Sequence, residues 1–233
     1  MRLPEGQQIL SETESTQDIL LTGIRNNTQH PGIVVAHHQT KGRGRFDRVW
    51  ESSPGESLCM SIAFENYANH PRPWLIGMSC AVAVASALHT QVRWPNDLTI
   101  RKRKVAGILT EIATTPAGDR IPVVGIGVNL NQAAMPPELS EIATSFLIER
   151  GHPLDVEETA HFILAAIEEL PDPQQWADLH PIWMLFDDTP GKHFKLADGG
   201  AATALGIGPE GELLCSVDGE TTSVMAADAI FGA

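Results

Sequence analysis

The chain has 233 residues, of which 42% are hydrophobic and 19% are charged. This composition is typical of a folded globular protein and excludes an intrinsically disordered one. No apolar run is long enough to span a bilayer, and the first residues lack the pattern of a secretory signal. The three cysteines, Cys59, Cys80 and Cys215, have no metal-binding spacing, so we expect reduced, buried thiols in a cytoplasmic protein.

The net charge of −13 is distributed unevenly along the chain. Residues 41–104 contain 10 of the 16 Lys and Arg residues and only 5 of the 29 Asp and Glu residues, so this segment carries +5 and the rest −18. A basic segment in an acidic protein predicts a local site for a small anion rather than a surface for a long polyanion. We therefore expect neither DNA nor a membrane as a partner.

A helix is expected to begin near Ser15, ahead of the apolar run Ile19–Ile24. Ser15 and Asp18 have the spacing of a helix cap. Hydroxyl groups and free backbone N–H groups at a helix start also suit a polar ligand. The two interpretations are compatible.

The segment Lys41-Gly42-Arg43-Gly44-Arg45 follows a short β-branched run, residues 32–36, and precedes a second expected strand at 58–64. The connection is long for neighbouring strands, which favours a functional loop. Its glycines let the backbone fold closely round a ligand, and its arginines offer donor forks for carboxylate or phosphate. Trp50 could supply a flat face for a ring. The alternative is a solvated basic turn.

The densest group of polar residues lies at 93–104. Trp94-Pro95-Asn96-Asp97 predicts a turn between strands, and its Asn and Asp would supply oxygen ligands for Mg²⁺. Lys104 ends a run of four basic residues and enters the apolar strand Val105–Leu109, which contains Gly107. A lysine beside a glycine in a buried strand can reach a ligand lying against the sheet.

The remaining elements frame these segments. We expect helices at 73–88, 143–147 and 155–170 and a strand at 123–131, whose Gly125 and Gly127 allow close approach. The third glycine of a dinucleotide-binding fingerprint is absent, which excludes a Rossmann site. From Lys192 onward, short strands with turns at Gly199-Gly200, 208–211 and 218–219 predict a small β-barrel that packs on the larger domain.

Together these segments resemble the biotin protein ligases, and they follow that family's order over nearly the whole chain. The matching pieces are Ser15-Thr16, Gln39, Gly42-Arg43-Gly44-Arg45 with Trp50, Trp94-Pro95-Asn96-Asp97, Lys104–Leu109, Gly125–Asn129 and the small C-terminal domain.

The resemblance implies an α+β fold. We expect a mixed-sheet, class II synthetase-like catalytic domain at 1–188 with helices on one side, and an SH3-like β-barrel at 189–233. Because the motifs begin by Ser15, the resemblance is to the short form without an N-terminal DNA-binding domain. It also implies a monomer or homodimer.

The resemblance further implies an ATP-dependent ligase that makes biotinyl-5′-AMP and transfers biotin to a lysine of a biotin carboxyl-carrier protein domain, with Mg²⁺. The family's catalytic positions correspond to Lys104, Arg45 and Arg43. Its biotin contacts correspond to Ser15, Thr16, Gln39, Arg43, Lys104, Gly107 and Gly127. Its ATP contacts correspond to Arg45, Trp50, Asn96, Asp97, Lys104 and Asn129, with Asn96 and Asp97 also near Mg²⁺.

The chain departs from the family's usual pattern at two places. Phe46-Asp47 stands where the loop often continues with arginine and glycine, and Arg93 stands where a lysine often precedes the Trp-Pro-Asn-Asp turn. Two alternatives stay open: a lipoate–protein ligase with a longer apolar pocket, or a non-catalytic module that binds biotin or the carrier. The Gly42–Arg45 loop and the strand after Lys104 favour biotin, and the intact Lys104 and Arg45 favour catalysis.

Overall fold

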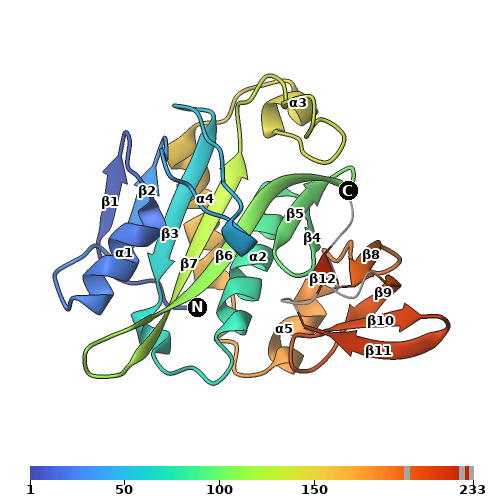
Figure 1. Ribbon diagram of the computed structural model, residues 1–233. Coiled ribbons are helices and arrows are strands. Elements are labelled where there is room, and N and C mark those ends of the chain that lie inside the picture. The colour runs from blue at the N-terminus through green and yellow to red at the C-terminus, as the bar shows by residue number, and fades with distance from the viewer. Residues whose placement is uncertain (197–199, 226–228, 231–233) are drawn as a thin grey trace.

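The computed structural model describes residues 1–196, 200–225 and 229–230. A seven-stranded sheet of order β1-β2-β3-β7-β6-β5-β4 forms its centre (Figure 1). The strands are β1 (Gln7–Leu10), β2 (Ile33–Ala36), β3 (Ser57–Ala63), β4 (Gln91–Arg93), β5 (Asp97–Ile100), β6 (Arg103–Thr114) and β7 (Arg120–Asn129). Strands β1 and β2 run parallel and the other neighbours antiparallel, which confirms the expected mixed sheet.

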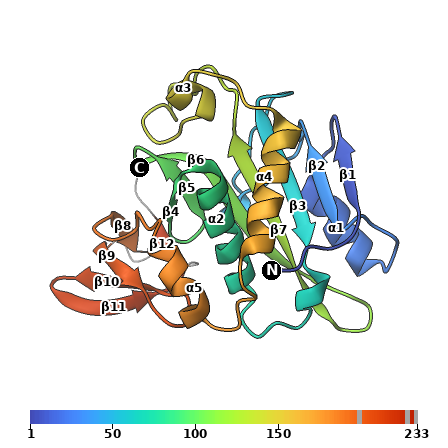
Figure 2. The same cartoon turned by 180° about the vertical axis from the view of Figure 1, so that it is seen from behind.

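Helices cover both faces of this sheet. The long helices α2 (Trp74–Leu88) and α4 (Val156–Glu169) cross one face, as Figure 2 shows. Helix α1 (Thr16–Arg25) lies on the opposite face, beside β2 and β3 (Figure 1). Successive residues of β2 accordingly pack in different cores, Val34 with α1 and Val35 with α2. The expectation of helices on one side therefore holds for α2 and α4 but not for α1.

The expected helices form with adjusted ends. Helix α2 begins after Pro73, and Asp155 caps α4 by accepting from the Glu158 backbone N–H. Helix α3 (Phe146–Arg150) begins three residues later than expected, because the Ser145 hydroxyl caps it by accepting from the Ile148 N–H. Helix α5 (Trp176–Trp183) was not expected, since it contains a proline. Two short 3-10 helices complete the set, η1 (Arg45–Asp47) and η2 (Glu65–Tyr67).

The C-terminal strands form a second, antiparallel sheet of order β11-β10-β9-β8-β12. Its strands are β8 (His193–Leu196), β9 (Ala201–Ile207), β10 (Leu213–Val217), β11 (Glu220–Val224) and β12 (Ala229–Ile230). This confirms the small all-β unit, while its closure into a barrel stays a prediction. The turn expected at Gly199 lies outside the described residues.

The second sheet packs on the first through a shared core. Buried residues of β8, β9 and β10 belong to the same apolar cluster as α2 and β6. The buried Trp94 side chain lies between the two sheets and donates from Nε1 to the Gly211 carbonyl at 2.9 Å. This confirms that the C-terminal unit packs on the larger one, and it shows that Trp94 serves in packing.

No helix within the described residues has the length and apolar character needed to cross a membrane. The three cysteines are buried and make no disulfide, as expected.

Candidate active site

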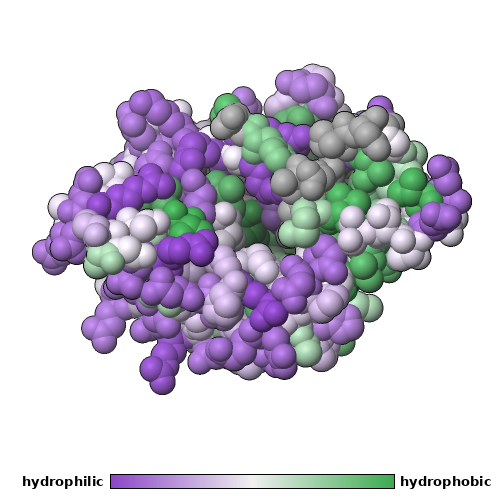
Figure 3. Space-filling view, turned by 60° about the horizontal axis from the view of Figure 1, so that its bottom comes forward, coloured by the Kyte–Doolittle hydropathy of each residue, from purple (hydrophilic) through white to green (hydrophobic). Residues whose placement is uncertain are grey.

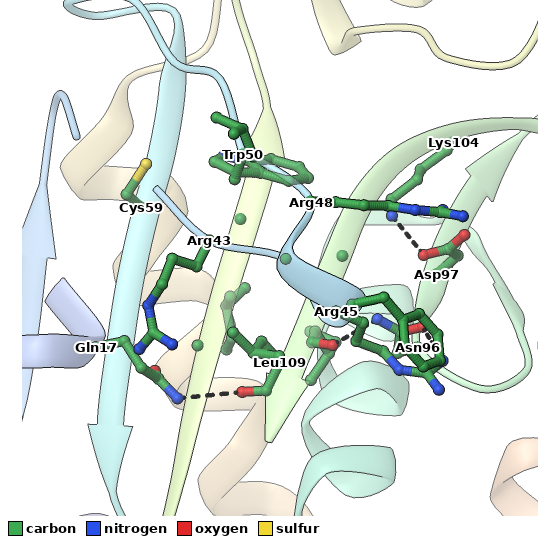
Figure 4. Close-up of a pocket in the computed structure, with 18 of the residues that line it drawn as sticks. Gln17, Arg43, Arg45, Arg48, Trp50, Cys59, Asn96, Asp97, Lys104 and Leu109 are labelled. Atoms are coloured by element: carbon green, nitrogen blue, oxygen red, sulfur yellow. Dashed lines mark hydrogen bonds and ion pairs between the residues drawn. The ribbon is translucent and has the colours of Figure 1, made fainter. Parts of the chain in front are cut away.

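A cavity of about 800 Å³ lies between the N-terminus of α1 and the β4–β5 turn. Strands β3, β6 and β7 form its floor, and the loop from Arg43 to Trp50 passes over it (Figure 4). The surface is hollowed between the main sheet and the C-terminal strands, with apolar residues at depth (Figure 3). Every site residue predicted from the sequence lines this cavity except Asn129.

Polar groups gather where α1 begins. Ser15 caps the helix by accepting from the Asp18 backbone N–H at 3.3 Å. Thr16 donates to Gln39 Oε1 from its backbone N–H at 2.7 Å and from its hydroxyl at 3.0 Å. Since Ser15 accepts at the cap, its own hydroxyl hydrogen can be donated to a ligand. This end of the cavity thus combines a donor with amide and hydroxyl acceptors.

Two buried polar residues that the sequence analysis did not single out extend this cluster. The Gln17 side-chain amide donates to the Val123 carbonyl at 3.1 Å and contacts the Leu109 carbonyl at 3.5 Å (Figure 4). Its Oε1 lies 2.9 Å from the Ser61 hydroxyl, which in turn lies 2.8 Å from Thr16 Oγ1. A glutamine directly after the cap motif and a serine inside a buried strand were the available signals.

Glycines in the floor allow side chains to lie flat against the strands. A Cβ on Gly107 would meet Nζ of Lys104 at 3.3 Å, so the missing side chain lets that lysine lie along β6. A Cβ on Gly127 would lie 2.5 Å from the Trp50 ring. Close approach at both glycines agrees with the sequence analysis, but Trp50 itself covers Gly127. A ligand ring over Gly127 therefore requires Trp50 to move.

Cationic side chains gather at the opposite end, near the β4–β5 turn. Lys104 Nζ pairs with Asp97 Oδ1 at 2.6 Å, and Arg45 donates to Asn96 Oδ1 at 3.3 Å. Figure 4 shows Arg48 pointing toward Lys104 and Asp97, and this arginine also lines the cavity. The sequence analysis missed Arg48, although it is the third arginine of the loop.

Burial and neighbouring charges act together on the cations at this end. Burial lowers the pKa of Arg45, the nearby Asp97 carboxylate opposes that shift, and the charge of Arg48 adds to it. Lys104 pairs with Asp97, and Arg45 and Arg48 lie close enough for their charges to interact, so positive charge gathers where a bound anion could meet it.

Arg43 does not join this group. Figure 4 shows its guanidinium pointing toward Gln17, and it pairs with Asp18 at 2.6 Å and with Glu111 at 3.0 Å. Although partial burial alone would lower the pKa of Arg43, Glu111 and Asp18 together raise it. In this conformation Arg43 fastens the loop to α1 and β6, and its predicted contact with biotin requires those pairs to be exchanged.

Asn129 lies at the end of β7, outside the cavity lining. It donates from Nδ2 to the Thr144 carbonyl at 3.1 Å, so it orders the segment before α3. Its predicted contact with ATP stays a prediction.

Burial raises the pKa of Cys59, which lines the cavity, to about 11; the nearby side chains of Ser52, Trp50 and Gln39 lower it in part. The thiol is therefore protonated at neutral pH and is a poor nucleophile.

The oxygens of Asn96 and Asp97 fit Mg²⁺ in a limited way. The described residues contain no cluster of three His, Cys, Asp or Glu side chains that could hold a metal alone. One carboxylate and one amide oxygen suffice for Mg²⁺ only when phosphate oxygens complete its ligand set. The donor set thus suits a metal that arrives with a nucleotide.

Known proteins resemble this chain in sequence and fold. Residues 10–131 match the model of the Biotin/lipoate A/B protein ligase family. The chain belongs to this family. It is 31% identical to the Bifunctional ligase/repressor BirA of Bacillus spizizenii, over 97% of this chain and 73% of that protein. It is 28% identical to the Biotin--[acetyl-CoA-carboxylase] ligase of Mycobacterium tuberculosis, over 95% of this chain and 87% of that protein.

The fold is also that of solved members of the family. The biotin protein ligase of Aquifex aeolicus, determined in complex with biotin and ATP, matches with a TM-score of 0.73. The match covers 97% of this chain and 98% of that one at 24% identity. It agrees with the mixed sheet and the small C-terminal β unit described above.

The two departures from the usual biotin/lipoate ligase pattern have local structural roles. Phe46 adopts a left-handed conformation with a φ of 55°, and the guanidinium of Arg45 stacks on its ring at 4.8 Å. Arg93 pairs with Asp188 at 2.9 Å and donates to the Lys102 carbonyl. Phe46 therefore orients an arginine of the site, whereas Arg93 ties β4 to the start of the C-terminal unit.

Proposed function

We propose that this protein is a biotin protein ligase, which activates biotin with ATP and transfers it to a lysine of a biotin carboxyl-carrier protein domain. The observation that carries the proposal is the chemical difference between the two ends of one cavity. Hydroxyl and amide groups at the start of α1 suit the ureido ring of biotin. Cations near Lys104 suit a carboxylate meeting a triphosphate. Relatives named for the same reaction support it.

In the first step, a biotin carboxylate oxygen attacks the α-phosphorus of ATP, and the bond to the pyrophosphate leaving group breaks. Both reactants are anionic, so positive charge must offset their repulsion. Lys104, Arg45 and Arg48 line the cavity and supply that charge near the β4–β5 turn. No side-chain nucleophile is needed, because the substrate carboxylate is the nucleophile and positioning carries the step.

Mg²⁺, when bound, would neutralise further phosphate charge, and the oxygens of Asp97 and Asn96 would hold it. In this structure Asp97 pairs with Lys104. The carboxylate of Asp97 is therefore held beside the ammonium group of Lys104.

In the second step, the amine of the carrier lysine attacks the acyl carbon of biotinyl-5′-AMP, and AMP leaves. The mixed anhydride hydrolyses in water, so it must be shielded until the carrier docks. The loop at 39–52 passes over the cavity and supplies that cover. We assign the adenine ring to the face of Trp50 once this indole has left Gly127.

The rival substrate within the family is lipoate, whose dithiolane ring has no N–H donor. The test supplies ATP, Mg²⁺ and a carrier domain with either biotin or lipoate, and measures the mass of the intact carrier. The matched control is the same carrier with its acceptor lysine replaced by arginine. The proposal predicts modification by biotin only, and only of the carrier with lysine. Modification by lipoate alone, or by neither acid, would contradict it.

Further properties belong to this proposal. We assign residues 1–188 to catalysis and 189–233 to a smaller domain that assists carrier transfer. The buried, unpaired cysteines favour a cytoplasmic location. The strongly negative charge outside residues 41–104 argues against specific binding of operator DNA, and a mobility shift assay tests this directly. A monomer or a homodimer is compatible with this assignment.

A further inference from the structure

The backbone at Lys104 lies at an irregular point of the main sheet. Strand β7 pairs with β6 from Ala106 onward, so this register begins beyond Lys104. On the other side, the register between β5 and β6 shifts, because Leu98 lies opposite Ala106 but Thr99 lies opposite Lys104. Such a shift is typical of a β-bulge, which re-aims a side chain and disrupts the local ladder. The position of Lys104 therefore depends on contacts from outside the sheet.

Those contacts come from residues 142–144, the segment before α3. The Lys104 N–H donates to the Ile142 carbonyl, and the Thr144 N–H donates to the Lys104 carbonyl, each at 2.8 Å. The two bonds make a short parallel bridge between Lys104 and Ala143. Ile142 lines the cavity, whereas Thr144 is fully buried. Residues 142–144 thus hold the backbone of the lysine whose side chain lines the cavity.

A buried carboxylate fixes both sides of this bridge. Glu149 of α3 has a side chain that is only 3% exposed. Its Oε1 accepts from the Thr144 hydroxyl at 2.8 Å and from the Arg103 guanidinium at 2.5 Å. Arg103 directly precedes Lys104 and also donates to the Ser140 carbonyl at 3.4 Å. Glu149 is therefore bonded to a neighbour of Lys104 on the strand and to a residue of the bridging segment.

The carboxylate of Glu149 is an expensive way to anchor a short helix. Burying a charge costs free energy, and an apolar residue of similar size often serves stability equally well. Oε2 of Glu149 accepts no hydrogen bond from the described residues and faces the exposed Arg101 guanidinium at 3.6 Å. Stability alone does not account for such a group, whereas its place beside both neighbours of Lys104 does.

We infer that Glu149 is a positioning residue for Lys104, which acts through Arg103 and Thr144 to hold the ammonium group where the reacting anions meet. This inference rests on the proposed function and extends it to a residue outside the cavity lining. A small displacement of a group that acts in the reaction slows that reaction far more than it weakens substrate binding elsewhere in the site. Loss of Glu149 should therefore lower the rate of exchange and leave biotin binding nearly unchanged.

The experiment is a double-mutant cycle, measured by biotin-dependent exchange of labelled pyrophosphate into ATP. Glu149→Gln keeps the size of the side chain and removes its charge, so it weakens the hold on Arg103. The exchange rate at saturating substrate should fall about tenfold, while the dissociation constant of biotin changes by less than about twofold. In the Lys104→Met background the same change should alter the rate by less than about twofold, because no ammonium group is left to displace.

Thr144→Val is the second variant, because it removes the other hydrogen bond to Glu149 and keeps the backbone bridge to Lys104. It should show the same dependence on Lys104, with a smaller fall in rate, whether or not Glu149→Gln folds. The matched control is Glu210→Gln, which breaks an ion pair with Arg72 at 3.0 Å outside the cavity. It should leave the exchange rate unchanged in both backgrounds.

A purely structural role predicts a different result, since a partly unfolded protein loses the same fraction of its activity in both backgrounds. Equal falls in the two backgrounds, or no fall for either variant, would overturn the inference and leave the proposed function standing. If the wild type exchanges no pyrophosphate in the presence of biotin, both are overturned.

Discussion

Lys104 lies in the cavity with its side chain packed against Gly107. Its backbone is fixed by hydrogen bonds to the Ile142 carbonyl and from the Thr144 N–H, so the residue is part of the sheet. Its side chain lies along Gly107 and ends at Asp97. Because the backbone of Lys104 is fixed and its side chain is flexible, its ammonium group can stay close to the negative charge that develops on the α-phosphate during carboxylate activation.

Replacing Lys104 by methionine keeps most of the chain's apolar length and removes the charge. We expect pyrophosphate exchange to slow about a hundredfold or more, on the order of 3 kcal/mol of transition-state stabilisation. Biotin binding should weaken less, because the ureido contacts lie at the other end of the cavity. Steady-state exchange kinetics and biotin titration measure the two effects separately.

The control for this change must lie outside the cavity. Lys102 belongs to the same basic run as Lys104, but it lines the cavity and therefore cannot serve as the control. Lys195 in β8 is exposed, so Lys195→Met is the matched variant. Equal exchange rates for the Lys104 and Lys195 variants would exclude Lys104 as the catalytic cation.

Cys59 makes stability sensitive to alkaline pH. Burial raises its pKa from 9.0 to about 11, so the folded protein keeps this proton where the unfolded chain releases it. The stabilising contribution is complete below pH 9 and is lost as the pH rises toward 11. Linkage sets the loss at about 2–3 kcal/mol of unfolding free energy over that range. Urea unfolding of the wild type and of Cys59→Ala at pH 8 to 11 should show a smaller decline for the variant; parallel declines would refute the assignment.

At the scale of single residues, the sequence identified the residues that line the cavity better than it identified their hydrogen-bond and ion-pair partners. Ser15, Thr16, Lys104 and Asp97 could be chosen because motifs mark them. The pairing of Arg43 with Asp18 and Glu111 depends on how α1 and β6 are placed across the sheet, which no local pattern encodes. Trp50 over Gly127 is unpredictable for the same reason.

The loop at 39–52 passes over the cavity. Its backbone closes on itself, since the Gly44 N–H donates to the Arg48 carbonyl at 2.7 Å and the Trp50 N–H to the Gly42 carbonyl at 3.0 Å. A Cβ on Gly42 would lie only 2.3 Å from the carbonyl oxygen of Trp50, so this turn requires glycine at position 42. Its glycines and its exposed position favour local opening.

We expect trypsin to cut this loop after its exposed basic residues in the protein alone, and biotin plus ATP to suppress that cleavage. The double variant Asp18→Asn, Glu111→Gln removes both partners of Arg43 and should be cut faster without ligand. Mass spectrometry of the fragments locates the cuts. Cleavage that is equally fast with and without ligand would rule out the loop as the cover of the site.

Elements with strong periodicity were predictable, and short or exposed ones were not. Helix α4 carries a clear cap and an apolar face, and helix α2 has a proline at its start and a continuous apolar run. Strand β1 is short and largely exposed, and its position beside β2 is set by parallel pairing rather than by its own sequence. Every residue of β3 is buried, so the serines within this strand do not mark a face exposed to solvent.

Across the whole molecule, Trp94 connects the two sheets. Trp94→Phe should destabilise the protein by about 1 kcal/mol through the lost hydrogen bond to Gly211, in addition to the lost ring atoms. The matched control is Trp176→Phe, at a buried tryptophan whose indole N–H makes no hydrogen bond among the described residues. Urea unfolding measures both. An equal loss in the two variants would show that the Trp94 hydrogen bond adds no stability.

The order of the motifs was enough to predict the architecture of the molecule. It could not predict that the two sheets share one apolar core. The short strands and glycine-containing turns from Lys192 onward correctly predicted a β unit that packs on the first domain. The continuity of the apolar cluster from α2 to β10 depends on side chains distant in sequence. This shared core is also why the second unit is best studied within the full chain.

The most direct test of the central claim is exchange of labelled pyrophosphate into ATP, measured with biotin, with lipoate and without either acid. Exchange requires the carboxylate, the triphosphate and the cations of the cavity to meet in one step, and it needs no carrier protein. A biotin ligase with the site described here exchanges pyrophosphate when biotin is present and not when lipoate replaces it. Exchange independent of biotin, or absent with it, would contradict the account.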